Sequence, residues 1–432
     1  MWALASWLAW FLSCPIMPAV VAACTGEPLI MTLPPTYYDF VRKLRPDLIE
    51  MAEQDAKDLL ARPNWPQTIG SVDDFDSRFP KYIERLNAQV LGFEPDHPGV
   101  SVREMGSILS NAPPQTRAAL ASLFATVNNE YHSVLNFTLF GRKVFHFSNN
   151  LTEHLANTEV NLKAASVELP FQACLFTFTS RTAINAMHNI RSQAGRSDIN
   201  SGLDYSAPVS VFLSIHKAGP ELAGRKLAIC AWHARLPNSS YLALKRELYL
   251  GEDWNLEQAL RTDWQRLTPH DLGPGLHVNL AAEAIAHQDD ETFYTDGLAF
   301  YRIVLNAVLY LSSDQADLLV KDSPRREIEE KAKEITSLSK RRKLLQTTGR
   351  YADLNYTEVG GSIGAIIIQK GQGDHGEAER DGRKPMVRFM VRGHWRRQAH
   401  GREGRERKLI WIRPHYKGPD FAATINKPYL VQ

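Results

Sequence analysis

The sequence predicts an α+β fold with a helical N-terminal part, a central, mostly antiparallel sheet with packed helices, and a basic C-terminal β-hairpin. Helical periodicity dominates as far as about residue 135, and short runs rich in Val, Ile and Phe follow in the middle of the chain. Towards the C-terminus, apolar and basic side chains alternate. The 432 residues, 44% of them hydrophobic, suffice for roughly two or three domains with a real core.

Residues 1–30 form a first, signal-like segment, and "VAAC" at 21–24 fits a lipoprotein cleavage box. A secretory signal normally begins with positive charge, whereas no Lys or Arg precedes this apolar run. The text from Met31 reads as an ordinary protein start. We therefore interpret residues 1–30 as a mis-assigned start and expect a cytoplasmic protein of a bacterial host. Export or lipoprotein anchoring by residues 1–24 is the alternative.

Residues 31–160 are expected to be a helical region. The segment 46–62 places apolar side chains along one helical stripe, and the segments 78–93 and 113–135 repeat the pattern. The stripe of the first segment comprises Leu48, Ile49, Ala52, Ala56, Leu59 and Leu60.

Residues 161–320 are expected to be an α+β core. The loop 218–224 is long enough for a hairpin, so the strands that it joins are expected to be antiparallel neighbours. Helical patterns return at 255–267 and from about 278 to 313, and residues 298–311 are apolar nearly all round, as in a buried central helix. These 14 residues are too few to span a bilayer, so no transmembrane segment is expected in the mature chain. The expected strands lie at 173–180, 207–217, 225–235 and 239–251.

Residues 321–432 are expected to be a basic C-terminal region that begins with a charged helix. Ser323 can cap this helix and Pro324 can occupy its first turn, and the helical pattern runs to about Leu345. The cluster "KRRK" at 340–343 has no acidic residue at helical pairing distance. The favourable pairs of the helix are Glu327 with Lys331 and Glu329 with Lys333.

Charge divides the chain into two parts. Residues 1–320 carry 25 Lys and Arg against 34 Asp and Glu, net −9, whereas residues 321–432 carry 25 against 14, net +11. Such an asymmetry indicates that the tail meets an anionic partner or docks on the acidic body of its own chain.

The end of the tail predicts the hairpin. Residues 386–395 and 408–416 alternate as strands with one buried face, and the Gly-rich segment 396–407 lies between them. Residues 381–418 hold 12 Lys and Arg but three Asp and Glu. One face of the hairpin is expected to carry Arg388, Arg392, Arg396 and Arg397, with Trp395, Trp411 and Tyr416 close by.

Several functions fit this hairpin. Guanidinium groups bind phosphates and aromatic rings stack on unpaired bases, so the segment suits nucleic acid, while a charged but purely structural hairpin is the alternative. A nuclease with His394 as general acid or base is a further alternative, although no spacing identifies a second catalytic group and we lean towards no enzymatic activity. The candidate contact residues are Arg388, Arg392, His394, Trp395, Arg396, Arg397, Trp411 and Arg413.

Other chemistry has weaker signals. His394, His400 and His415 lack a Cys or carboxylate at ligand spacing, so we expect no metal, and no motif indicates a cofactor. His216 and His233 lie on expected strands and are interpreted as structural histidines. The four cysteines have no close CxxC spacing, and the chain has no HExxH or Walker signature.

The tail resembles a known family. "RGHWRRQAHG" at 392–401, followed by "KLIWIRPHYKG" at 408–418, resembles the C-terminal signature of the type V-A anti-CRISPR family of phages and plasmids. "VLNAVLYLSSDQADL" at 304–318 and "ELPFQAC" at 168–174 agree in order. The residues that match the signature are Arg392, Gly393, His394, Trp395, Gly401 and Trp411.

The resemblance implies a function. Members of this family lower production of the RNA-guided type V-A effector nuclease by recognising its nascent chain and promoting loss of its messenger RNA. For this chain it implies a body that binds a polypeptide and a basic tail that contacts RNA or the ribosome. A plasmid or phage accessory protein that binds nucleic acid is the other alternative.

Overall fold

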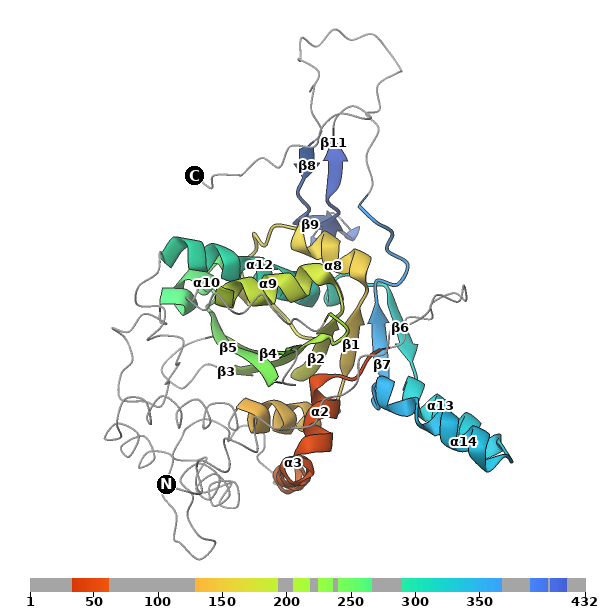
Figure 1. Ribbon diagram of the computed structural model, residues 1–432. Helices are drawn as coiled ribbons and strands as arrows, with labels where there is room; N and C mark the ends of the chain where they lie inside the picture. Colours follow the sequence, from red (N-terminus) through yellow and green to blue (C-terminus); the bar gives the residue numbers. More distant parts are fainter. Residues whose placement is uncertain are drawn as a thin grey trace, which may run out of the picture.

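The computed structural model describes residues 33–61, 129–192, 205–217, 224–235, 240–265, 290–366, 389–402 and 405–417. A seven-stranded mixed sheet forms the centre, and helices cover both of its faces (Figure 1). The predicted α+β class is confirmed. Within these ranges no helix is long and apolar enough to cross a membrane.

The sheet has the strand order β5-β4-β3-β2-β1-β7-β6. The four predicted central strands are antiparallel neighbours, and the pairing of β3 with β4 is the one that the loop 218–224 indicated. β1 runs parallel to both β2 and β7, and β6 is antiparallel to β7 at the edge. β1 lies within the segment that was expected to be helical. The sequence did not predict this strand, because four residues are too few to show a strand pattern. The strands are β1 (Val144–Phe147), β2 (Ala173–Phe178), β3 (Val209–Lys217), β4 (Arg225–Arg235), β5 (Ser240–Leu250), β6 (Leu318–Lys321) and β7 (Tyr356–Val359).

Four helices cover one face of the sheet: α8 (Asn149–Ala156), α9 (Arg181–Ser192), α10 (Leu256–Gln265) and α12 (Asp290–Leu311) (Figure 1). α12 is the predicted central helix, and its apolar residues from Phe300 to Tyr310 are fully buried. On β2, Phe176 and Phe178 pack against this layer, whereas Leu175, the residue before them, packs on the other side.

The opposite face is covered by α2 (Tyr37–Leu44), α3 (Pro46–Leu60) and a helix at residues 129–139 (Figure 1). The predicted helix at 46–62 is confirmed, and the predicted helix at 78–93 lies outside the described residues. Tyr37 stacks on Trp232 with ring centroids 4.2 Å apart. Because both faces are covered, the central strands are apolar on both sides rather than alternating.

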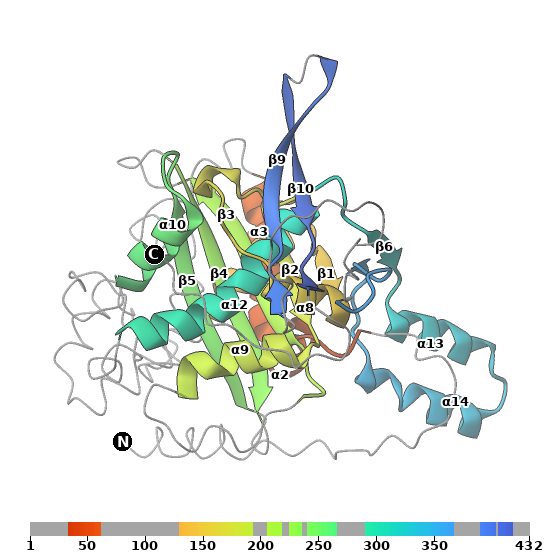
Figure 2. The same ribbon diagram turned by 90° about the horizontal axis from the view of Figure 1, so that it is seen from above.

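The charged helix after the sheet is broken into α13 (Pro324–Glu334) and α14 (Leu338–Leu345). Ser323 caps α13 as predicted, accepting a hydrogen bond from the backbone of Arg326. The prediction of one continuous helix is wrong, because Ile335 is extended and a second helix begins at Leu338. The two helices project as an arm (Figures 1 and 2), and "KRRK" is exposed on α14. The ion pairs are Arg325 with Glu329 and Glu330 with Lys333 rather than those expected.

The core histidines have hydrogen-bond partners. His233 Nδ1 lies 2.8 Å from His188 Nε2, and its other ring nitrogen lies 3.1 Å from the carbonyl oxygen of Ala207. His216 contacts the Ser214 hydroxyl at 2.8 Å. These contacts agree with the structural role expected for His216 and His233.

Candidate nucleic-acid and partner interface

The basic tail folds back on itself in two steps. β9 (His394–His400) pairs with β10 (Glu406–Ile412), and β8 (Phe389–Val391) pairs with β11 (His415–Lys417). The predicted hairpin is thus present, but its first strand is interrupted at residues 392–393, and residues 396–400 extend the strand instead of forming the loop. Gly401 has φ +74° at the turn, which suits glycine.

Gly393 explains the interruption. Its N–H donates to the carbonyl of Asn157 at 2.9 Å, and its own carbonyl accepts from the N–H of Glu159 at 2.8 Å. A Cβ atom here would lie 2.5 Å from Oγ1 of Thr158 and 2.9 Å from the carbonyl oxygen of Ile412. A glycine is therefore required where the hairpin docks on the end of α8.

Trp395 anchors β9 in the body. It stands directly across from Trp411 of β10, and the two indole rings stack with centroids 6.0 Å apart. The Trp395 Nε1–H donates to Oδ1 of Asn306 on α12 at 2.7 Å. Asn306 Nδ2 donates in turn to the carbonyls of Leu155 and Thr158 at 2.9 and 2.8 Å, so one buried amide joins the hairpin, α12 and the end of α8.

Trp411 anchors β10 in the same way. Its indole N–H donates to Oγ1 of Thr158 at 3.1 Å, and its backbone N–H donates to Oε1 of Gln315 at 2.9 Å. The ring of Tyr310 packs edge-to-face with it, with ring centroids 5.3 Å apart. Trp411 is 3% exposed and Trp395 is 7% exposed. Both rings are therefore buried anchors, and neither offers the open face that stacking on a base requires.

His154 of α8 supports the same cluster from below. Its ring packs edge-to-face with that of Trp411, with ring centroids 5.8 Å apart. Its Nε2 lies 3.0 Å from the carbonyl oxygen of Gly364. Burial lowers the pKa of His154, with the nearby Arg413 acting in the same direction and the Gly364 hydrogen bond opposing it. A neutral imidazole therefore sits under the anchor near neutral pH.

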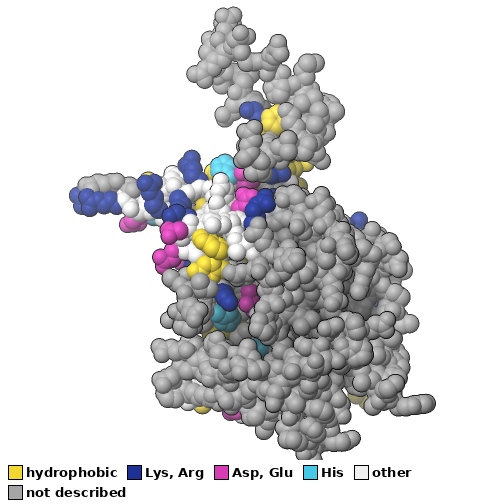
Figure 3. Space-filling view, turned by 90° about the vertical axis from the view of Figure 1, so that its left-hand side faces the viewer, with side chains coloured by type: hydrophobic (Ala, Val, Ile, Leu, Met, Phe, Trp, Pro, Cys, Tyr) yellow, Lys and Arg dark blue, Asp and Glu magenta, His cyan; other side chains and the backbone are white. Residues whose placement is uncertain are grey.

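Beyond the anchor the hairpin becomes a basic arm, defined here as residues 396–402 and 405–410. None of these residues is buried. Figure 2 shows β9 and β10 projecting away from the helices, and in Figure 3 the projecting part carries Lys and Arg side chains along its length. The exposed arginines of the arm are Arg396, Arg397, Arg402, Arg405 and Arg407.

The arginines were expected to share one face of the hairpin, and this expectation is wrong for Arg396 and Arg397. Since side chains alternate along a strand, Arg397 lies on the Trp395 face and Arg396 lies on the other. Arg397 donates to the Ser166 hydroxyl at 2.6 Å, towards the body. Arg388 lies outside the described residues.

The remaining candidate residues lie near the base of the hairpin. Arg392 is half-buried and its Nη1 is 4.0 Å from a carboxylate oxygen of Glu159. The guanidinium of Arg413 lies 5.7 Å from the centre of the Trp411 ring. His394 is exposed at the start of β9, across from Ile412. In the described part of the chain, no three His, Cys, Asp or Glu side chains gather as metal ligands.

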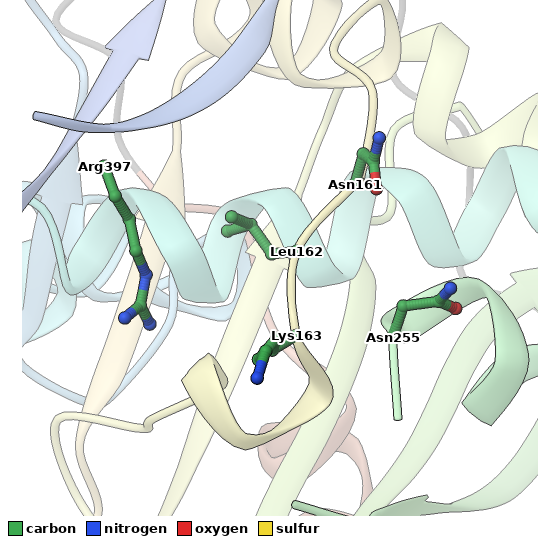
Figure 4. Close-up of a pocket in the computed structure, with 5 residues that line it drawn as sticks. All are labelled: Asn161, Leu162, Lys163, Asn255 and Arg397. Carbon is green, nitrogen blue, oxygen red and sulfur yellow. The ribbon is translucent and has the colours of Figure 1, made fainter. Parts of the chain in front are cut away.

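The structure adds residues that the sequence analysis missed. An open pocket of about 350 Å³ lies at the foot of the arm and is lined by Asn161, Leu162, Lys163, Asn255 and Arg397 (Figure 4). Thr158 and Asn306 of the anchor were also missed. Asn306 left a signal, since it is the one amide side chain within the apolar run 298–311.

Comparison with known proteins places this architecture in a family. The model of the anti-CRISPR type V subtype A2 family matches residues 145–416, more than half of the chain. The match begins in β1 and ends in β11, so it includes the sheet, the anchor and the basic arm. No curated protein matches the chain. The resemblance found in the tail is confirmed, and the chain belongs to the anti-CRISPR type V subtype A2 family.

Proposed function

We propose that this protein, encoded on a phage or plasmid, acts in the cytoplasm of a bacterial host to lower production of a type V-A effector nuclease. Its body binds the target polypeptide and its basic arm contacts RNA or the ribosome. Membership of the anti-CRISPR family supports the target class. The observation that carries the RNA contact is a hairpin fixed at its base whose outer part exposes arginines on both faces.

The burial pattern separates anchoring from binding. Trp395 and Trp411 are buried and fix the hairpin to the body. No side chain of the basic arm is buried to that extent, so the arm contributes much less buried apolar area than the anchor does. Exposed like charges repel one another, and a polyanion bound along the arm would relieve this repulsion. Guanidinium groups bind phosphates with two parallel hydrogen bonds, which makes an RNA backbone the fitting partner.

The test is binding of the full chain to a labelled single-stranded RNA, measured by fluorescence anisotropy over a range of salt. We expect the logarithm of affinity to fall linearly with the logarithm of salt, at about 0.7 per phosphate contact. The variant Arg396→Gln/Arg407→Gln should flatten this slope by about one to two. Arg181→Gln/Arg261→Gln, two exposed arginines of α9 and α10, is the matched control. If Arg396→Gln/Arg407→Gln has the same salt dependence of RNA binding as the wild type, the arm does not contact the RNA.

Edge strand β6 supports the polypeptide contact. It pairs with β7 on one side, and three successive apolar side chains are exposed, with Val320 at 76%. Exposed strand edges accept extended peptides through main-chain hydrogen bonds, with side chains adding specificity. We place the target chain along this edge.

Capture of ribosome-bound nascent effector chains tests this placement. Val320→Lys should weaken capture several-fold, because a charge on an edge strand disfavours pairing with another strand. Leu60→Lys, an equally radical change at a side chain 51% exposed on α3, should leave capture unchanged. Equal loss in both variants, or in neither, would rule out β6 as the docking edge.

A further inference from the structure

The pocket at the foot of the basic arm has the composition of an anion site. Two cations, Lys163 and Arg397, line it together with the amides of Asn161 and Asn255 and the apolar side chain of Leu162. No carboxylate is among these lining residues. In Figure 4, Arg397 reaches down from β9 on one side, Asn255 stands on the other, and residues 161–163 pass between them.

The walls of this pocket are held in place by backbone hydrogen bonds. Lys163 and Asn255 form an antiparallel bridge, and the N–H of Leu256 donates to the carbonyl of Leu162 at 2.9 Å. The N–H of Ala164 donates to the carbonyl of Trp254 at 2.7 Å. The loop and the start of α10 are thus joined, and the lining side chains come from a preformed frame.

Arg397 is positioned from the other side. It lies two residues from Trp395 on the same face of β9, so the buried indole sets the direction in which the guanidinium points. Its Nη2 donates to Oγ of Ser166, which belongs to the 3₁₀ turn Ala164–Ser166. Arg225 stabilises this 3₁₀ turn by donating to the carbonyls of Ala165 and Val167.

We propose that this pocket binds one nucleotide of an RNA strand, with its phosphate on Lys163 and Arg397. Guanidinium and ammonium groups recognise phosphate, Asn amides hydrogen-bond base edges, and an apolar side chain such as Leu162 packs against the face of a base. A volume of about 350 Å³ is at the small end of ligand pockets, which suits one nucleotide rather than a larger ligand. The assignment rests on the proposed RNA contact of the arm and gives it a defined subsite.

The test is equilibrium dialysis of the full chain against labelled adenosine monophosphate, with unlabelled inorganic phosphate and adenosine as competitors. Lys163→Gln and Arg397→Gln should each weaken binding about tenfold or more, since each removes a charge-assisted contact. Ser166→Ala removes the hydrogen bond that positions Arg397 but keeps its charge, so a smaller, few-fold loss is expected. Arg261→Gln, on the helix that follows Asn255, should bind as the wild type does.

The outcomes distinguish this site from the arm. Nucleotide binding that Lys163→Gln and Arg397→Gln reduce supports the pocket, even if Arg396→Gln/Arg407→Gln leaves the salt dependence of RNA binding unchanged. Absence of nucleotide binding at millimolar concentration, or equal binding by all variants, would overturn it. If inorganic phosphate binds as tightly as the nucleotide, the assignment of a nucleotide is wrong.

Discussion

A few residues decide how the basic tail meets the body. Asn306 is a buried polar side chain in an otherwise apolar helix, and its three hydrogen bonds join the hairpin, α12 and the end of α8. Thr158 accepts from Trp411 while its own hydroxyl donates to the carbonyl of His154 at 2.8 Å. Because buried polar groups are costly when they lose their partners, these contacts fix one position for the hairpin.

Gly393→Ala tests this docking. The added methyl group would lie well inside contact distance of Thr158 Oγ1 and of a backbone carbonyl, so the hairpin must shift. We expect a loss of about 1–3 kcal/mol in the free energy of unfolding, measured by urea denaturation. Gly349→Ala, where a Cβ atom would meet nothing within 4 Å, is the control and should cost far less. Equal effects would contradict the proposed role of Gly393.

His146 gives a prediction for pH. This histidine of β1 is buried, and burial lowers its pKa to about 4, with a hydrogen bond to Thr177 opposing the shift. The unfolded chain binds the proton more readily, so the stabilisation is complete above about pH 6.5 and is lost as the pH falls towards 4. The loss should amount to about 3 kcal/mol. Urea denaturation across this range should show a shallower decline for His146→Gln than for the wild type. Parallel curves would contradict the assignment.

At the scale of elements, the hairpin divides into an anchor and an arm. The anchor is part of the main core through Trp395 and Trp411, whereas the arm has no fully buried side chain and packs against this core through the partly buried Leu409. The helical arm of α13 and α14 is a second projecting element, and α14 likewise has no buried residue. Elements of this kind add little to stability, which leaves their surfaces available to a partner.

This division predicts that binding and stability can be changed separately. Arg396→Gln/Arg407→Gln should leave the free energy of unfolding within about 0.5 kcal/mol of the wild type, because both side chains are exposed. Trp411→Ala should cost about 3–5 kcal/mol, since it empties a buried site. Thermal and urea unfolding measure both effects. A large destabilisation by the arginine changes would mean that the arm has a structural role after all.

The sequence predicted the elements that have a clear repeat. The antiparallel strands β2 to β5 and the central helix α12 follow from long apolar runs, and the cap at Ser323 follows from a Ser-Pro pair. β1 and β7 were missed because four residues of strand carry almost no periodic signal. The break at Ile335 was missed although Thr336 and Ser337 follow it, residue types that favour the start of a new helix.

The candidate site was predicted in part. The alternation of apolar and basic residues located the hairpin, but it could not tell which aromatic rings would be covered. Trp395 and Trp411 were expected near a binding face. Instead Trp395 contacts Asn306, 89 residues away along the chain, and Trp411 contacts Thr158, 253 residues away. Such long-range contacts leave no local pattern.

At the scale of the whole molecule, the basic region and the acidic body fold together. β7 pairs directly with β1, and the hairpin anchor rests on α8 and α12, so residues after 321 complete the sheet and the core. The fragment 321–432 should therefore lack cooperative thermal unfolding and near-ultraviolet circular dichroism on its own. A cooperatively folded fragment would contradict this dependence. For this reason binding experiments require the full chain.

The most direct test of the proposed function is synthesis of a type V-A effector nuclease in a translation extract, with its protein and messenger RNA both quantified. Added wild-type protein should lower both, while an unrelated reporter in the same extract is unchanged. Arg396→Gln/Arg407→Gln should lose most of this effect, and Arg181→Gln/Arg261→Gln should retain it. Effector yield that is unaffected by the wild type, or reduced equally by the hairpin variant, would contradict the account.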